Sequence, residues 1–115
     1  MTRKQRHTAY VDCPIEAALD RIGGKWKGSI LYACSLGVCR FNELRRQFPK
    51  ISQRTLTNQL RELEADGLLD RKVFAEVPPR VEYSLTAPAR ALLPILEGLH
   101  GWGLAHALDP NAETA

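Results

Sequence analysis

The stretch ISQRTLTNQLRELEADGLL, residues 51–69, constrains the fold most because it marks both ends of a helix. Ser52 is of a residue type that caps helix N-termini, and Gly67 suits the left-handed position just past a helix C-terminus. Leucines at positions 56, 60 and 63 fall on one stripe of a helix that turns about 100° per residue. The stretch therefore predicts an amphipathic helix that buries its leucine stripe.

A shorter helix is predicted immediately before this one. Asn42 is a candidate N-cap for the run ELRRQF, and Pro49 ends that run because proline interrupts the helical hydrogen-bond pattern. Only the short segment PKI separates the two helices. Two helices joined by a turn of this length form a helix-turn-helix.

After Gly67, apolar residues recur at every second position, the spacing typical of β-strands. LLDRKVF and RVEYSL are runs typical of β-strands, and the segment AEVPP between them has paired prolines that suit a loop tip. A hairpin that directly follows a helix-turn-helix is the wing of a winged helix.

Further helical patterns flank this unit. CPIEAALDRIG and KWKGSILYACSLG predict two helices before it, and Thr86 caps the long region APARALLPILEGLHGWGLAHAL, in which Pro94 should kink or break the helix. One small domain has little interior left to cover so apolar a region, so a partner subunit is its natural cover. The interface is expected at Leu92, Leu96, Leu99 and Trp102. The predicted fold is mainly α (α+β): a winged helix-turn-helix with a two-stranded wing and terminal dimerisation helices.

The length of 115 residues predicts one domain, residues 11–108, between a flexible basic N-terminal tail (1–10) and a flexible C-terminal tail (109–115). Three cysteines are an odd and small number for a disulfide scaffold. No apolar run approaches the ~20 residues that a membrane span needs. We therefore expect a cytoplasmic protein without a membrane partner.

Basic charge is concentrated on the predicted helix-turn-helix. Residues 40–61 contain six Lys or Arg and one Glu, a local net charge of +5 in a chain whose net charge is +3. Such a concentration attracts polyanions, although a merely solvated basic surface is the simpler alternative. A winged-helix module that binds only protein would not need this charge, so the pattern favours double-stranded DNA.

The outward side of the helix that follows Ser52 carries side chains that suit base reading. Arg pairs with guanine, Asn and Gln pair with adenine, and Thr suits phosphate or the thymine methyl group. We expect base reading by Gln53, Arg54, Thr57 and Asn58. We expect contacts with phosphate or the minor groove from Arg45, Arg46, Lys50, Ser52, Arg61 and Arg80.

Neither catalysis nor a cofactor is indicated by the sequence. It shows no paired acids in a pocket-forming context, no nucleophile–base pair and no phosphate loop, so an enzyme is not expected. Cys34 and Cys39 lack the second pair of ligands that a zinc site needs, so no metal is expected. A small-molecule effector site between Trp26, Trp102 and the terminal helices stays open. The two main alternatives are a sequence-specific DNA-binding regulator and a winged-helix module that binds protein.

Three blocks of the chain together resemble the HxlR-type winged helix-turn-helix transcriptional regulators of bacteria. The blocks are CPIEAALDRIGGKWKGSILYAC, RFNELRRQFPKISQRTLTNQLRELEADGLLDRKVF and PPRVEYSLTAPARALLPILEGLHGWG, and the resemblance runs from Asp12 to His106. It implies a homodimer built on the terminal helices, with two recognition helices in successive major grooves of an often palindromic operator. The chain departs from the family pattern at Ala87-Pro88-Ala89, where members commonly have a polar pair followed by glycine.

Cys13 directly precedes Pro14 at the start of the first predicted helix. The partial positive charge of a helix N-terminus favours a thiolate there. Some HxlR-type proteins sense oxidants or electrophiles through a cysteine in this position, so the resemblance makes Cys13 a candidate redox sensor. The alternative is an unreactive cysteine at the edge of the domain. Cys34 lies on an apolar helix face and is expected in the core.

Overall fold

The computed structural model describes residues 12–37 and 39–108, so both predicted tails lie outside the described residues. The elements in chain order are α2 (Pro14–Ile22), α3 (Lys27–Ser35), α4 (Phe41–Gln47), α5 (Gln53–Ala65), β1 (Leu69–Phe74), β2 (Arg80–Leu85), α6 (Ala87–Ala91), α7 (Leu93–Trp102) and the π-helix η1 (Gly103–Ala107). In this part of the chain, no helix has the length and apolar character needed to cross a membrane.

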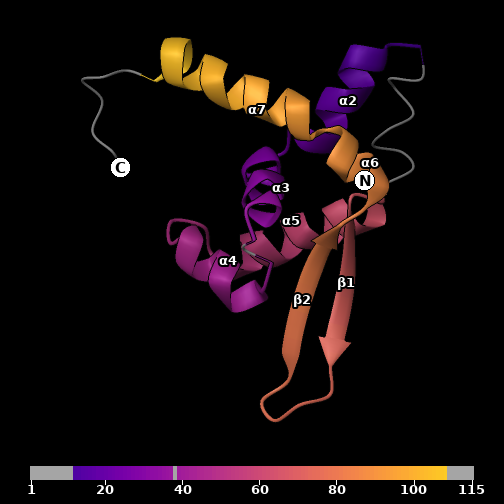
Figure 1. Ribbon diagram of the computed structural model, residues 1–115, viewed down its shortest axis with the longest axis vertical. Coiled ribbons are helices and arrows are strands. Elements are labelled where there is room, and N and C mark those ends of the chain that lie inside the picture. Colours follow the sequence, from indigo (N-terminus) through magenta and orange to yellow (C-terminus); the bar gives the residue numbers. More distant parts are fainter. Residues whose placement is uncertain (1–11, 38, 109–115) are drawn as a thin grey trace.

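Helix α3 occupies the centre of the molecule. Figure 1 shows α2 and α7 at one end of it, α4 and α5 towards the other end, and the hairpin of β1 and β2 projecting away from α7. The buried core joins residues of α3, α4 and α5 to the hairpin base and to the terminal helices. This arrangement is a winged helix-turn-helix, as the sequence predicts.

Helix α5 has the ends and the buried stripe that the sequence predicts. Ser52 Oγ accepts a hydrogen bond of 3.0 Å from the Thr55 backbone N–H, which caps the first turn. Gly67 has a φ of 76°, and the Leu68 N–H donates to the Leu63 carbonyl at 2.9 Å, which closes the last turn. The stripe residues Leu56, Leu60 and Leu63 are at most 1% exposed.

The hairpin confirms the predicted wing. Its strands pair antiparallel, with Leu69 opposite Leu85 at the base and Phe74 opposite Arg80 near the tip. The segment before α4 adds to the other edge of β2, because the Tyr83 N–H donates to the Cys39 carbonyl at 2.8 Å. The wing is therefore attached to the helix-turn-helix by backbone as well as by side chains.

Two helix starts differ from the predicted ones. Helix α4 has Arg40 as its N-cap, so Asn42 lies inside the first turn and the predicted Asn42 cap is wrong. The reason is that Arg40 bridges to Glu82 in an extended conformation, and the helix begins directly after it. Helix α3 begins at Lys27, because Trp26 adopts a left-handed conformation with a φ of 77°.

The C-terminal region is broken at the predicted proline. Thr86 Oγ1 accepts a hydrogen bond of 3.3 Å from the Ala89 N–H and caps α6, as predicted. Helix α6 ends at Ala91, and α7 begins at Leu93 with Pro94 in its first turn. Proline is tolerated in a first turn but not in a helix interior, which explains two helices in place of one.

Candidate nucleic-acid interface

The outward side of α5 forms a continuous polar surface. Its side chains line one shallow depression and are called the reading surface below: Gln53, Arg54, Thr57, Asn58 and Arg61. All except the half-buried Thr57 are exposed. The structure therefore brings together the four predicted base-reading residues and adds Arg61 to them. Because α5 begins at Gln53, two of these side chains stand in its first turn, where helices of this type reach base edges.

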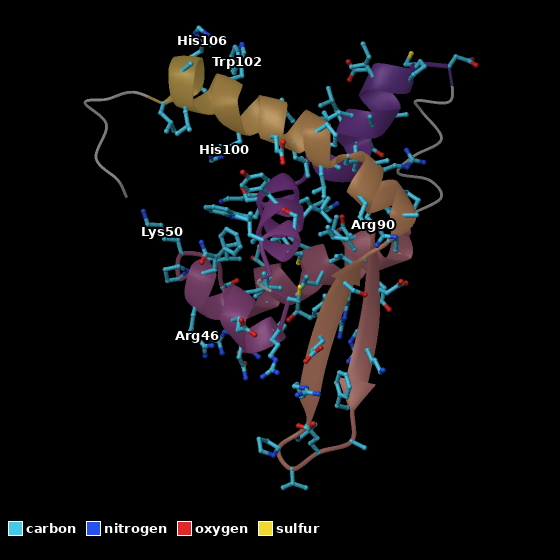
Figure 2. The ribbon with its side chains drawn as sticks, viewed as in Figure 1. Arg46, Lys50, Arg90, His100, Trp102 and His106 are labelled. Carbon is cyan, nitrogen blue, oxygen red and sulfur yellow. The ribbon has the colours of Figure 1, made fainter. Side chains whose placement is uncertain are left out.

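Basic side chains of α4, and of the turn that joins α4 to α5, are exposed. Arg45 and Arg46 occupy the last turn of α4, where positive charge is favourable to the helix dipole, and Lys50 follows in the turn. Figure 2 shows Arg46 and Lys50 directed away from the body of the molecule. Within the described residues, none of the three forms an ion pair, so their charge is not neutralised by a neighbouring carboxylate.

Ser52 has a structural role that competes with phosphate binding. Its hydroxyl accepts from the Thr55 N–H and donates to Thr55 Oγ1, both at 3.0 Å. A phosphate contact would have to replace or share these bonds. The N-cap role follows directly from the sequence, whereas the phosphate role stays a prediction.

Arg80, which the sequence analysis expects to contact phosphate or the minor groove, lies between two carboxylates at the wing. Its guanidinium lies 3.3 Å from Glu76 and 3.0 Å from Glu82, and it stands 4.0 Å above the centre of the Phe74 ring. Only 30% of the side chain is exposed. The sequence contained a signal for this pairing. Arg80 and Glu82 are two residues apart on one strand, and side chains at that spacing point to the same face.

Glu82 is a residue of this region that sequence reasoning missed. Its carboxylate lies 3.2 Å from Arg40 as well as 3.0 Å from Arg80, so it joins the start of α4 to the wing. Arg40 is also 3.6 Å from Glu43. Of the cations in residues 40–61, Arg40 is therefore paired beside the wing, whereas Arg45, Arg46 and Lys50 have no ion pair among the described residues.

The sequence can now be compared with known proteins. Residues 21–110 match the family model described as HxlR-like helix-turn-helix. The chain belongs to this family. A curated relative, the HTH-type transcriptional regulator YdeP of Bacillus subtilis, is 56% identical over 94 residues, which cover 82% of this chain and 73% of YdeP.

Solved structures of similar regulators have the same fold. The redox regulator HypR in its reduced form matches with a TM-score of 0.77 and 54% identity, over 82% of this chain and 93% of the HypR chain. The reduced form of the transcriptional regulator YodB from B. subtilis matches with a TM-score of 0.71 and 31% identity, over 84% of this chain and 97% of that chain. The protein is thus a winged-helix transcriptional regulator of the HxlR-like family.

This HxlR-like chain exposes large apolar side chains on its terminal helices. The set, called the apolar end below, consists of Ile15, Leu19, Ile95, Leu99, Trp102, Leu104 and Leu108, which are between 46% and 75% exposed. Figure 2 shows Trp102 near the outer end of α7, directed away from the rest of the molecule. Side chains added at Gly98, Gly101 and Gly103 would meet nothing within 4 Å, so this side of α7 is open to a close neighbour.

The structure changes the expected interface at two leucines. Leu96 is 5% exposed and belongs to the chain's own core, and Leu92 is half-buried against that core. Both therefore help to cover the interior of this chain: Leu96 faces the first turn of α3, and Leu92 packs against the core at the junction of α6 and α7. Leu99 and Trp102 remain exposed, and Ile15 and Leu19 of α2 add to them.

A cavity of about 450 Å³ lies between α3, the end of α4 and α7. Its lining includes Tyr32, Phe48 and His100, and the rings of Tyr32 and His100 stack with centroids 5.1 Å apart. Trp26 and Trp102, which the sequence suggested for an effector site, do not line it.

The three cysteines differ in exposure. Cys13 is exposed at the N-cap position of α2, and its side chain makes no capping hydrogen bond. Burial raises the pKa of Cys34 to about 12. Burial, and then the carboxylates of Glu43 and Glu82, also raise the pKa of the half-buried Cys39. Among the described residues, no group of three His, Cys, Asp or Glu side chains is placed to hold a metal ion.

Proposed function

We propose that this regulator is a cytoplasmic, sequence-specific DNA-binding protein that acts as a homodimer on a (pseudo)palindromic operator. The observation that carries the proposal is the reading surface on α5, flanked by the exposed and unpaired cations of α4 and its turn. Polar side chains of these types offer hydrogen-bond donors and acceptors to base edges, and cations beside them suit phosphates.

Base reading is assigned to four side chains of the reading surface: Gln53, Arg54, Thr57 and Asn58. Within the described part of the chain, the side chains of Gln53, Arg54 and Asn58 form no hydrogen bond or ion pair, so their donors and acceptors are available to a base. Each bidentate pair with a base discriminates by about 1–3 kcal/mol. Arg54 suits guanine, and Asn58 suits adenine.

Affinity is assigned to Arg45, Arg46 and Lys50, together with Arg61 of the reading surface. Each phosphate that a protein neutralises contributes about −0.9 to the slope of log affinity against log salt. If three cations of each protomer touch phosphate, a dimer should show a slope of about −5. Arg80 contributes less in this proposal, because Glu76 and Glu82 already neutralise it.

The homodimer is supported by the apolar end. Among the described residues, seven of the ten exposed large apolar side chains lie on α2, α7, η1 and the residue after η1, so the exposed apolar surface is concentrated at this end. A second copy of the chain would cover them with the same surface, as a two-fold interface requires. Two-fold symmetry then presents two α5 helices to two half-sites, which explains a (pseudo)palindromic operator.

A redox response through Cys13 is a further part of the proposal. Support comes from the exposed position of Cys13 two residues before Ile15 of the apolar end, and from the likeness to HypR, which is known as a redox regulator in oxidised and reduced forms. Two thiols would lose two protons and two electrons to hydrogen peroxide, forming one disulfide and two water molecules. The second thiol belongs to the partner subunit or to a small cellular thiol.

The DNA-binding proposal is tested by fluorescence anisotropy with a labelled duplex from the DNA upstream of the protein's own gene, against a scrambled duplex, in a salt series. We expect preference for the upstream duplex and a steep loss of affinity with added salt. If the protein binds neither duplex, in vitro selection from a random-sequence pool follows. Failure to enrich any sequence there contradicts the proposal and favours a winged-helix module that binds protein.

The redox proposal is tested by limited alkylation and mass spectrometry at neutral pH, before and after peroxide treatment. Cys13 should be labelled first, because Cys34 and Cys39 are less exposed and their raised pKa values keep them as thiols. Peroxide should abolish labelling of Cys13 and change DNA affinity, and Cys13→Ser should remove the change in affinity. A Cys13 thiol that reacts no faster than in the unfolded chain would exclude it as the sensor.

A further inference from the structure

Lys27 is a buried cation at the start of α3. Its side chain is 2% exposed, and it is the charged residue that the core contains among those described. The Lys27 Nζ lies 2.5 Å from Glu62 Oε1, which belongs to α5 and stands 35 residues further along the chain. Glu62 is 42% exposed, so the ion pair runs from the core to the edge of α5.

The loop before α3 is shaped around this lysine. A side chain at Gly24 would place its Cβ 2.8 Å from both Cδ and Cε of Lys27, a distance that real contacts essentially never show. Trp26, the residue before Lys27, has a φ of 77°, which is uncommon for any residue other than glycine. Both features direct the lysine stem inwards, towards α5.

Stability alone does not account for a lysine at this position. Burying an ammonium group costs free energy, and replacing a buried ion pair by apolar side chains is often neutral or stabilising. An ion pair differs from an apolar contact in direction, because it holds two particular atoms together. The leucine stripe holds α5 against the core, whereas the bond to Glu62 also fixes the rotation of α5 about its own axis.

We infer that Lys27 and Glu62 are positioning residues that set the rotation of α5 for base reading. The inference rests on the proposed function. Glu62 lies one residue beyond Arg61 and four beyond Asn58, on the same helix as the whole reading surface. A rotation of ~10° moves a side-chain tip at ~6 Å from a helix axis by ~1 Å. A displacement of that size is enough to lose a hydrogen bond to a base.

The same turn of α3 also contacts α7. The next residue, Gly28, faces α7, where an added Cβ would lie 3.7 Å from Leu96 Cδ2. Figure 1 shows α3 running between α7 and α5. The first turn of α3 therefore contacts α7, which carries part of the apolar end. The same turn contacts α5 through the ion pair of Lys27 with Glu62. If α7 moved on assembly or oxidation, α3 would move with it, and the Lys27–Glu62 ion pair would change the orientation of α5 and of the reading surface.

Lys27→Met tests the inference through sequence discrimination, with the exposed neighbour Lys25→Met as its matched control. The readout is the ratio of dissociation constants for a random duplex and for a duplex that the wild-type protein selects from a random pool. Lys27→Met should lower this ratio roughly three- to thirtyfold and leave binding to random DNA unchanged. An unchanged ratio, or an equal loss in Lys25→Met, would overturn the inference.

A double variant separates positioning from packing. Lys27→Met combined with Glu62→Met replaces the ion pair by two apolar side chains, which should keep the urea midpoint of unfolding close to that of the wild type. Discrimination between the two duplexes should stay low in this variant. Recovery of wild-type discrimination would show that packing is sufficient and would overturn the positioning role.

Two further measurements keep the test decisive. If Lys27→Met does not fold, Glu62→Gln replaces it, with Glu64→Gln on the same helix as the control. If the wild-type protein selects no sequence, the proposed function fails, and amide hydrogen exchange of the unbound protein decides whether Lys27 holds α5. Faster exchange in α5 in the Lys27 variant supports this, and unchanged exchange overturns it.

Discussion

The two ends of the molecule expose opposite chemistry. At one end, α4 and α5 present arginine, lysine and amide side chains that water solvates well while they are unbound. At the other end, α2, α7 and η1 present leucine, isoleucine and tryptophan, whose exposure costs about 25 cal/mol for each Å² of apolar surface. In the proposed function, a single chain presents the first end to DNA, whereas the second end is covered by another copy of the chain.

A second contrast lies within the basic region. Arg40 and Arg80 share the carboxylate of Glu82 beside the wing, whereas Arg46 and Lys50 have no such partner among the described residues. Cations of equal formal charge therefore differ in how readily they can bind phosphate. Net charge in the sequence identifies a basic region, but its distribution over ion pairs decides which side chains are available.

The largest effect should come from a charge placed at the apolar end. Trp102→Asp should dissociate the homodimer, because an interface that buries a carboxylate without a partner loses the free energy of association. Losing the linked second half-site should then weaken operator binding about a hundredfold or more. Sedimentation velocity and anisotropy measure the two effects. Val77→Asp is the control, since Val77 is fully exposed at the wing tip, and it should leave the oligomeric state unchanged.

A smaller effect is expected from the reading surface. Arg54→Ala should cost about 1–3 kcal/mol on the selected duplex and much less on random DNA, because a base contact contributes only where its base is present. Anisotropy with both duplexes measures the difference. The control is Arg90→Ala, because Arg90 (labelled in Figure 2) lies on α6, donates to the Leu85 carbonyl and does not belong to the reading surface. Equal losses on both duplexes would exclude base reading by Arg54.

Ser52 allows its capping and DNA-binding roles to be separated. Ser52→Ala should lower the free energy of unfolding by about 1 kcal/mol, because the Thr55 N–H loses its acceptor. Ser52→Asp should keep the cap and the stability, yet weaken DNA binding if phosphate lies close to this position. Urea unfolding and anisotropy of both variants provide the comparison. If Ser52→Asp binds DNA as the wild type does, residue 52 is a cap alone.

The smallest effect, a gain in affinity, should follow the release of the paired arginines. Glu82→Gln removes the carboxylate that Arg40 and Arg80 share, so binding to random DNA should strengthen about threefold and the salt slope should steepen by about 1. Glu97→Gln, on α7 at the other end, makes the same change in net charge. Should both variants gain equally, net charge and not the release of these two arginines would be the cause.

Local signals in the sequence account for much of the fold. The caps at Ser52 and Thr86, the break at Pro94 and the glycine after α5 all lie where the chain predicts them, because each depends on residues within one or two turns. The four predicted base-reading residues also lie together, since they share one side of a regular helix.

Long-range contacts account for what the sequence did not predict. Arg40 replaced Asn42 as the cap of α4 through its bridge to Glu82 of β2. Leu96 looked equivalent to Leu99 in the apolar pattern of α7, but the packing of that helix on α3 buries one and exposes the other. Nothing in the sequence distinguishes Lys27 from the other lysines, and only the structure shows that it lies beside Glu62.

The sequence by itself thus determined the elements, several of their ends and the side of α5 that faces outwards. Periodicity and capping act over a few residues, and a linear chain displays them directly. Only the tertiary structure decided which charges are paired, which leucines stay exposed and which residues contact α5. Those properties depend on distances between residues far apart in the chain, such as the 2.5 Å that separate Lys27 from Glu62 across 35 positions.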